Sequence, residues 1–421
     1  MSEIAVARRE NTSTASILTV VAGRPLHPIV FIVVLGGLTA LGPFTMDLYL
    51  PAFPLIETDL DTTTTMVQLT LTATAIGLGL GQLVVGPLSD SIGRKGPVAS
   101  GTGLHVASSL VIALAPSIEI VAFARFGQGF GAAAGSVVAA AMIRDLFGGK
   151  RLVRMAARIA LISGLAPIVA PVIGSQLLLI TDWRGVFWLL AGFGALILAA
   201  VVILLPETLP RTAPGTAQRG WKDRVAVLVR DRVYIGAVIV GAMIFAAIVS
   251  YLSASPFIFQ DGYGLSEQAF GLIFAVNAIG LLVATQISAR LMRRYRPASL
   301  LRVALPAMVL SGIAFVGVGL LDGEWWWAVA ASSLLVALHG FSGPCLNVLI
   351  LARHQQQSGT AVAIGGFVNS VVGGILSLMP ALLGGVSVIS LGVVVAGSAA
   401  FGLIALLIVV RPSSVPELTA D

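Results

Sequence analysis

The stretch Arg184–Leu205, RGVFWLLAGFGALILAAVVILL, carries a charge at its first position and none afterwards. Its length matches the run of about 20 mainly apolar residues that an α-helix needs to cross a lipid bilayer. Further stretches of this kind follow one another along the 421-residue chain. We therefore predict an all-α membrane protein with twelve spans, at residues 29–54, 66–88, 97–115, 118–142, 155–180, 184–205, 232–259, 266–289, 299–320, 325–351, 359–383 and 387–410.

The composition supports this fold class and excludes others. Hydrophobic residues form 57% of the chain and Asp, Glu, Lys and Arg only 10%, against about 25% charged residues in an average soluble domain. So few charges cannot cover a water-exposed surface, and the lipid bilayer is the expected surrounding. The single cysteine, Cys345, and four scattered histidines give no disulfide and no metal-ligand spacing. We expect no metal, no cofactor and no enzyme activity, because no nucleophile, base or metal cluster stands out.

A polar segment near the middle of the chain divides the spans into two sets of six. It reads PETLPRTAPGTAQRGWKDRVAVLVRD, residues 206–231. We predict two six-helix bundles, 28–206 and 232–411, a linker at 207–231, and cytoplasmic tails at 1–27 and 412–421. Within the linker, residues 219–231 are either a short amphipathic helix on the membrane surface or a solvated connection. The polar first tail does not have the pattern of a signal peptide.

The positions of the basic residues predict the orientation. If the N-terminus is cytoplasmic, all of the 25 Lys and Arg residues except Arg125 and Arg184 lie in or beside inside segments. This is the asymmetry of multi-pass proteins, whose inside loops are basic. It predicts a cell-membrane protein with both termini in the cytoplasm. The net charge of +6 then reflects the orientation of the chain in the membrane, and it does not indicate a nucleic-acid binding site. A monomer is expected.

Two charges, Asp47 and Arg125, fall inside predicted spans. A charge in hydrocarbon costs at least about 2.5 kcal/mol, so each needs a reason. At the rise of a helix, both lie about 12 Å from the outside face. They could share one cavity and interact directly or through water. Burial favours protonated Asp47, a nearby Arg125 favours its ionised form, and a substrate entering between them could release the proton. The alternative is a pair that only locks two helices together.

The span around Arg125 has two distinct faces. Gln128 and Ser136 share a polar stripe with Arg125, which we interpret as cavity lining, together with the small Gly129. The other face carries glycines at four-residue spacing, which allow close helix contact: Gly127, Gly131 and Gly135. No phosphate-binding glycine motif follows a strand, and no G-x-x-x-x-G-K-[ST] is present, so ATP is not the expected energy source.

Two further spans carry conformational or polar signals. Pro167 and Pro171 each remove a backbone donor, and with Gly164 and Gly174 they predict a bent helix, unless they are ordinary packing residues. In the second set of six spans the buried polar residues are neutral, so any proton site belongs to the first set. We interpret Asn277, Asn347 and Asn369 as cavity walls, with an interhelical hydrogen bond as the alternative for each. Tyr251 is a candidate aromatic wall, with a lipid-facing or packing role as its alternative.

The loop after the second span reads GPLSDSIGRK, Gly86–Lys95. It resembles the loop signature of the major facilitator superfamily, G-x-L-[AS]-D-x-x-G-R-[KR]. The resemblance implies that Asp90, Arg94 and Lys95 belong to a charge network that latches the inside-closed state. The chemistry agrees, because Gly93 permits a tight turn and Asp90 could accept hydrogen bonds at the next helix start. The corresponding loop 290–296, RLMRRYR, lacks the acid.

Three other segments narrow the resemblance. RFGQG at Arg125–Gly129 resembles a signature whose arginine is associated with proton coupling. GLAPIVAPVIG at Gly164–Gly174 resembles the antiporter signature of the fifth span, although Ser175 stands where a second glycine is often found. MDLYLPAFP at Met46–Pro54 is similar to the end of the first span in the bicyclomycin/chloramphenicol-resistance family of drug:proton antiporters, and Tyr49 within it would line the substrate cavity.

The resemblance implies a major facilitator fold, two six-helix bundles around a central cavity. It also implies proton-driven multidrug efflux, with small amphipathic antibiotics of the amphenicol or bicyclomycin kind as substrates. Inward proton movement supplies about 2.3 kcal/mol per charge per 100 mV, which is enough for export without ATP. The partners would be a small-molecule substrate, protons and lipid. The alternative is a proton-linked exporter of a metabolite such as an amino acid or a sugar.

Overall fold

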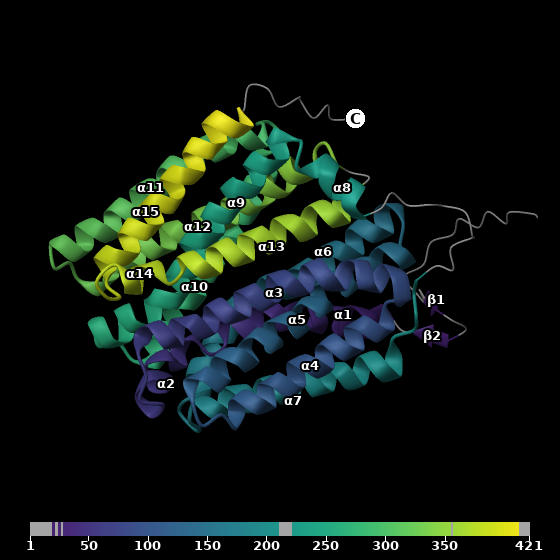
Figure 1. Cartoon of the computed structure of the whole chain (residues 1–421), viewed down its shortest axis with the longest axis horizontal. Coiled ribbons are helices and arrows are strands. Elements are labelled where there is room, and N and C mark those ends of the chain that lie inside the picture. Colours follow the sequence, from purple (N-terminus) through teal and green to yellow (C-terminus); the bar gives the residue numbers. More distant parts are fainter. Residues whose placement is uncertain (1–18, 22–23, 27, 210–220, 355–356, 412–421) are drawn as a thin grey trace, which may run out of the picture.

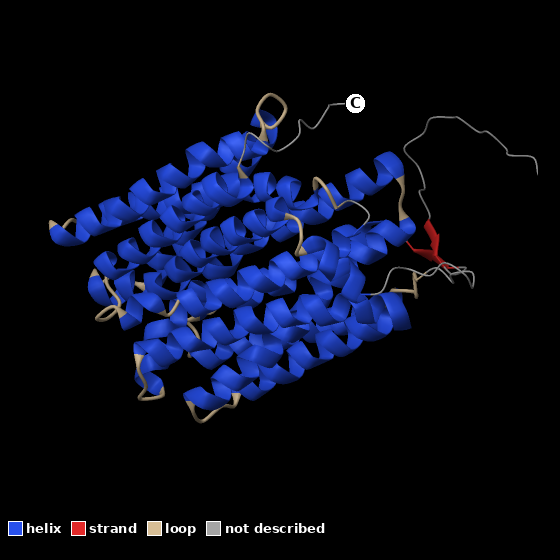
Figure 2. Cartoon of the chain, turned by 45° about the horizontal axis from the view of Figure 1, so that its top comes forward, coloured by secondary structure: helices blue, strands red, loops and turns tan. Residues whose placement is uncertain are grey.

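The computed structural model describes residues 19–21, 24–26, 28–209, 221–354 and 357–411. Long helices dominate this part of the chain (Figures 1 and 2). One small antiparallel pair of strands, β1 (Thr19–Val21) and β2 (Arg24–Leu26), precedes them, with Thr19 opposite Leu26. Most of the two predicted tails and residues 210–220 of the predicted linker lie outside the described residues.

The first six long helices, which we call the N-half, are separated by short connections. A 3₁₀ turn, η1 (Leu50–Ala52), and a short helix, α2 (Phe53–Asp59), follow the first of them. The six are α1 (Pro28–Asp47), α3 (Thr64–Ile92), α4 (Lys95–Ala113), α5 (Ile118–Leu146), α6 (Gly149–Leu177) and α7 (Trp183–Leu204).

The last six long helices form the C-half. The short α8 (Trp221–Leu228) precedes them, so part of the segment predicted as a linker is helical. The six are α9 (Arg232–Pro256), α10 (Glu267–Leu291), α11 (Pro297–Leu320), α12 (Trp325–Leu351), α13 (Ser358–Leu376) and α15 (Val388–Ala405). Shorter pieces follow α9, α13 and α15: the π turn η2 (Phe257–Gly262), α14 (Met379–Leu382) and the π turn η4 (Leu406–Val410).

Eleven helical stretches of the described chain are long and apolar enough to cross a membrane. The twelfth long helix is α4, whose glycines, serines and His105 make it less apolar. It packs between α5 and α7, where a polar face meets protein rather than lipid. The predicted all-α membrane fold with twelve spans is confirmed.

The helix ends differ from the ends of the predicted spans at positions where a capping side chain or a proline starts or stops the helix. Thr63 accepts a hydrogen bond from Met66 N and starts α3, and Asp182 accepts bonds from two amides of α7. The first predicted span, 29–54, is broken, because α1 ends at Asp47. Pro51 has no N–H to continue an α-helix, and the chain turns through η1 instead. This break places Asp47 and Tyr49 at the end of a helix.

Close helix contact within the N-half depends on small residues. A Cβ on Gly135 of α5 would collide with the carbonyl of Leu38 in α1, so the predicted packing role of this glycine stripe is confirmed. Gly129 is also a packing position, because a Cβ there would collide with the carbonyl of Thr74 in α3. Our prediction that Gly129 lines a cavity was wrong. Helical rotation, which the sequence does not specify, decides such positions.

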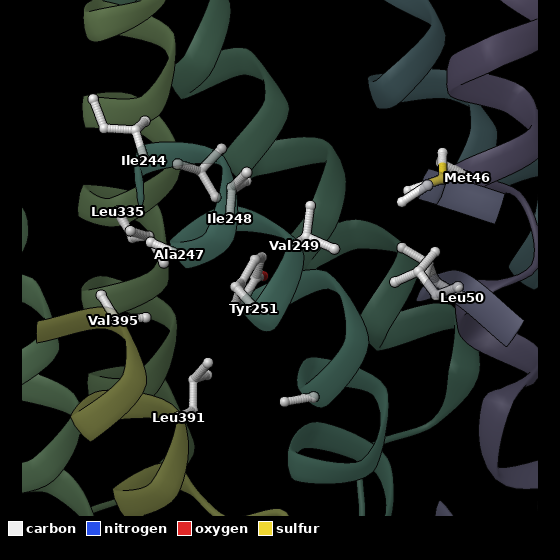
Figure 3. Close-up of a cluster of buried hydrophobic side chains, with 14 of the residues drawn as sticks. Met46, Leu50, Ile244, Ala247, Ile248, Val249, Tyr251, Leu335, Leu391 and Val395 are labelled. Atoms are coloured by element: carbon white, nitrogen blue, oxygen red, sulfur yellow. The ribbon is translucent and has the colours of Figure 1, made fainter. Parts of the chain in front are cut away.

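The two halves meet along two helix pairs, α3 with α13 and α6 with α10. Figure 1 shows α3 beside α13 in the middle of the molecule. We call the end that holds η1, α2 and η2 the α2 end, and the opposite end, with α8 and the turn at Gly93, the α8 end. One hydrophobic cluster spans both halves: Figure 3 shows Tyr251 of α9 between the C-half residues Leu335 and Val395 and the N-half residues Met46 and Leu50.

Candidate functional site

Asp47 is the last residue of α1 and is 7% exposed. It is the one buried carboxylate among the described residues. No described cation forms an ion pair with it, and no described side chain donates a hydrogen bond to it. An isolated buried charge is costly, so such a carboxylate holds a proton readily until its surroundings change.

Arg125 of α5 is fully buried. Its Nη1 donates a hydrogen bond of 2.5 Å to Oε1 of Gln128. Its Cζ lies 3.8 Å from the centre of the Tyr49 ring and 5.8 Å from that of Phe187, so the charge rests on aromatic faces. Nε and Nη2 have no hydrogen-bond partner among the described residues. The guanidinium therefore retains donors that a ligand can use.

The structure does not join Asp47 and Arg125 directly. Tyr49, two residues after Asp47, occupies the face of the guanidinium, and both charges act electrostatically on Tyr49. The tyrosine hydroxyl lies 3.2 Å from Oγ1 of Thr70 in α3. The expected direct contact is replaced by an aromatic ring, because the turn after α1 carries Tyr49 towards α5.

A buried polar chain continues from Arg125 into α4. Gln128 donates from Nε2 to Oγ of Ser109 over 2.7 Å, and Ser109 donates to the carbonyl of His105 over 2.7 Å. The sequence interpretation missed these two α4 residues and Thr70. His105 and Ser109 do stand one helical turn apart within a span, which is the signal that could have found them.

In the C-half the structure brings Tyr251 and Asn277 together. Nδ2 of Asn277 donates to the tyrosine hydroxyl over 2.8 Å and to Oγ of Ser332 over 3.1 Å, and Ser333 donates to Oδ1 of Asn277 over 2.6 Å. The Tyr251 ring stacks on Phe274 with centroids 5.5 Å apart. This centre is neutral, and its asparagine is hydrogen-bonded at both ends.

The other predicted cavity residues do not join these centres. Ser136 donates to the carbonyl of Ala133 in its own helix. Asn347 is exposed near the α8 end of α12. Asn369 packs against Gly241 of α9, and its Oδ1 has no partner among the described residues.

At the α8 end, Arg94 links three elements of the N-half. Its Nη1 donates to Asp90 over 2.5 Å and to Ser89 over 3.1 Å, and its Nε donates to Asp145 at the end of α5 over 2.9 Å. Burial opposes this charge, but the bonds to Asp145 and Asp90 outweigh burial and raise the pKa of Arg94 above its ordinary value. Gly86, one turn before Asp90 in α3, packs at ordinary distance against Val137.

Glu207 caps the start of α4, a role that the sequence suggested for Asp90. Its carboxylate accepts hydrogen bonds from the backbone N–H of Arg94 (2.7 Å) and of Lys95 (3.1 Å). Gly93 has a φ of +107°, and a Cβ there would press on this carboxylate. Burial would raise the pKa of Glu207, but the backbone donors outweigh it and hold the pKa below its ordinary value. The ammonium of Lys95 donates to the carbonyl of Val202.

The proline-containing segment of α6 lies where the halves meet. The helix continues through Pro167 and Pro171, and the predicted bend stays a prediction. A Cβ on Gly174 would collide with the carbonyl of Leu48, directly after Asp47. Gly164 faces Leu282 of α10. The predicted antiporter helix thus touches both the end of α1 and the C-half.

Hydrogen bonds from glutamine side chains connect the halves towards the α2 end. Gln68 donates to the carbonyl of Ser253 (3.1 Å), Gln260 to that of Pro51 (3.1 Å), and Gln268 to that of Ser175 (3.0 Å). Phe53 and Phe257 pack nearby, with ring centroids 5.8 Å apart. These contacts hold the α2 end closed.

Other features of the described residues offer no competing centre. No group of three or more His, Cys, Asp or Glu residues there could hold a metal ion. A cavity of about 430 Å³ at the α2 end is lined by Thr64, Asp261, Tyr263 and Ser387, among others. None of the predicted site residues lines it.

The chain belongs to the major facilitator superfamily, whose model matches residues 35–378. It is 32% identical to an uncharacterized MFS-type transporter, YdgK, of Bacillus subtilis, over 82% of this chain and 86% of that protein. It is 31% identical to a bicyclomycin resistance protein homolog of Haemophilus influenzae, over 84% and 89% respectively. The fold resembles the crystal structure of a D-xylose-proton symporter, with a TM-score of 0.73 and 16% identity over 93% of this chain and 99% of that chain. The chain is a multi-pass membrane transport protein and not an enzyme.

Proposed function

We propose that this transporter exports small amphipathic drugs from the cytoplasm in exchange for protons. The observation that carries the proposal is the buried carboxylate of Asp47, which has no ion-pair partner among the described residues and ends the first long helix. Such a carboxylate can bind a proton on one side of the membrane and lose it on the other when its surroundings change. Relatives that include a bicyclomycin resistance protein homolog support a drug as the substrate.

Arg125 supplies the coupling in this proposal. Its Nε and Nη2 can donate to an acceptor on the drug, since the described residues leave them without partners. A drug that accepts hydrogen bonds from Nε and Nη2 also pulls the guanidinium off the Tyr49 ring. The cation then moves closer to the carboxylate of Asp47. A cation closer to the carboxylate favours its ionised form, so drug binding releases the proton. The inward proton movement supplies about 2.3 kcal/mol per charge per 100 mV.

The C-half provides the opposite wall of the drug site. Tyr251 and Phe274 present stacked aromatic surface, and Asn277 holds the tyrosine hydroxyl in place. A wall of this kind favours neutral or weakly polar compounds with aromatic parts, because the described C-half centre has no charge to pair with. It therefore selects by shape and apolar contact rather than by charge.

Alternating access follows from rocking of residues 28–206 against 232–411. The α2 end faces outwards and is closed by the glutamine bonds between the halves. The α8 end faces the cytoplasm, with both termini on that side, as the distribution of Lys and Arg indicates. The protein acts as a monomer in the cell membrane and uses no cofactor beyond the proton gradient.

The test is transport by the reconstituted protein. Vesicles with an imposed pH gradient are given a panel of amphenicols, bicyclomycin, amino acids and sugars, with wild type, Asp47→Asn and Asp59→Asn. Asp59 is the control because its carboxylate lies at the exposed end of α2, where it contacts Trp183 and Arg184 and not the residues around Arg125. We expect proton-driven drug movement by wild type and Asp59→Asn but not by Asp47→Asn. Movement of a metabolite and no drug would overturn the substrate assignment, and a fully active Asp47→Asn would overturn the proton site.

A further inference from the structure

The guanidinium of Arg125 is held by two kinds of contact, the hydrogen bond to Gln128 and the ring face of Tyr49. Of its nitrogens, Nη1 has a hydrogen bond, to Gln128, while Nε and Nη2 have none among the described residues. The contact with the Tyr49 ring is attractive but only weakly directional. A shift of Gln128 would therefore let the guanidinium slide off the ring.

Helix α4 holds Gln128 at two points. Ser109 accepts the amide of Gln128 over 2.7 Å, and the Nδ1 atom of His105 lies 3.4 Å from the backbone carbonyl of Gln128. The hydroxyl of Ser109 donates to the backbone carbonyl of His105. A lone pair on the Ser109 oxygen is therefore available to accept the bond from Gln128. All three side chains are fully buried.

Two glycines let the neighbouring helices approach His105 closely, Gly131 at its backbone and Gly194 at its ring. A Cβ on Gly131 of α5 would lie 2.7 Å from the backbone nitrogen of His105, and a Cβ on Gly194 of α7 would lie 3.0 Å from Cδ2 of the ring. Because Nδ1 faces a carbonyl, Nδ1 carries the proton that makes this hydrogen bond. Nε2 has no partner among the described residues. The neighbouring helices thus fix the ring with Nδ1 towards Gln128.

We propose that His105 and Ser109 are positioning residues for the drug and proton site. Together they form an α4 clamp: they hold Gln128, and Gln128 holds Arg125 over Tyr49. This inference rests on the proposed function, since it concerns the same buried arginine. His105 and Ser109 contact neither the drug nor the transported proton. They act on Arg125 only through Gln128.

The clamp has a consequence for pH dependence. Among the described residues, Tyr49 from the end of α1 and His105 from α4 interact electrostatically with Arg125, and Asp47 acts on the same Tyr49. A guanidinium released from Gln128 is free to approach Asp47, the carboxylate that lacks a partner. The ionised carboxylate is then favoured before drug arrives, and proton binding needs a more acidic solution. Half-maximal transport should shift towards lower pH.

The test compares His105→Leu with His105→Asn. Asparagine can place an N–H donor where Nδ1 stands, and leucine cannot. Loss of a hydrogen bond in this network should raise the drug KM about tenfold in His105→Leu and in Ser109→Ala, with the pH profile moved to the acidic side. His105→Asn should restore the wild-type drug KM and the wild-type pH profile. Ser108→Ala is the control, because Ser108 is a buried neighbour in α4 that takes no part in the chain.

A second measurement tests the clamp without transport. Thermal unfolding in detergent of His105→Leu, Gln128→Leu and the double variant gives their coupling. Non-additive losses support the clamp. Additive losses overturn it, as does a His105→Asn variant that behaves like His105→Leu in the pH profile. If wild type moves no drug at all while the coupling persists, the proposed function fails and the contact between His105 and Gln128 stands.

Discussion

The centres of the two halves occupy equivalent helices but differ in chemistry. The N-half centre joins the end of its first helix, its second helix and its fourth through Tyr49, Thr70 and Arg125. The C-half centre joins its own first, second and fourth helices through Tyr251, Asn277 and Ser332. In the N-half, a buried cation and a buried carboxylate keep unused hydrogen-bonding capacity. In the C-half, the asparagine is bonded at both ends.

The difference shows where a ligand or a proton can change the energy of the protein. A satisfied neutral network gains little from a new partner, because each new bond replaces an existing one. A buried charge without a full set of partners gains much from one. We therefore assign energy coupling to the N-half centre and the shaping of the drug site to the C-half centre.

The largest effect is expected at Arg125. Arg125→Met keeps much of the side-chain volume but removes the cation over Tyr49 and the bond to Gln128. Proton-driven transport should fall by about 30-fold or more, as expected for removing one partner of a buried charged contact. Arg125→Lys keeps the charge and should recover part of the rate. Transport by Arg125→Met at the wild-type rate would remove the N-half from the coupling mechanism.

An intermediate effect is expected where the halves touch. Gln260→Leu combined with Gln268→Leu removes two bonds across the α2 end, each worth about 1 kcal/mol, and should shift the population of molecules open at that end about 30-fold. The readout is labelling of Phe53→Cys by an impermeant thiol reagent, in a background with Cys345→Ser.

Gln176→Leu serves as the control for this closure, because Gln176 is exposed at the same end and leaves the cross-half bonds intact. Faster labelling only in the double variant is the expected result. Equal labelling in all variants would mean that the glutamine bonds do not keep the α2 end closed.

A smaller effect is expected at the C-half centre. Tyr251→Phe removes one acceptor of Asn277, whose Nδ2 still donates to Ser332. The drug KM should rise about threefold, with the dependence of transport on pH unchanged, because no titrating group is involved. A shifted pH profile in this variant would contradict the separation between the two centres.

The smallest effect is expected in the loop at the α8 end. Backbone donors hold the pKa of Glu207 below its ordinary value of 4.5. This contribution to stability is therefore present above pH 4.5 and is lost as the pH falls through the lower folded value. Glu207→Gln should lower the melting temperature by about 2 °C at pH 7 and by less at pH 3.5. Equal losses at both pH values would contradict the carboxylate's role as the cap of α4.

The sequence predicts the helices and the pairing of Arg94 with Asp90 well, because hydrophobic length and motif spacing are local properties. The contact between Tyr251 and Asn277, two residues far apart in the chain, was not predicted. Helix rotation is not local, and this explains the error at Gly129, which packs against α3 instead of lining a cavity. Asn347 is exposed, and its role as a cavity wall stays a prediction.

Other features depend on partners distant in the chain. Asp145 and Glu207 complete the Arg94 network from the ends of other helices, and no spacing rule connects them with the Gly86–Lys95 loop. Asp47 and Arg125 lie in the same region without touching, because the turn that follows Asp47 and leads into η1 brings Tyr49 over the guanidinium. A pattern of residues predicts depth in the membrane but not which side chain occupies the space between two charges.

The central claim is that drug binding releases a proton from Asp47. It can be measured directly by adding chloramphenicol to the detergent-solubilised transporter in weakly buffered solution with a pH-sensitive dye. We predict release of about half a proton per bound drug by wild type near the pH at which half of the Asp47 sites are protonated, and no release by Asp47→Asn, although it still binds drug. Equal proton release by Asp47→Asn, or drug binding by wild type without any release, would contradict the account.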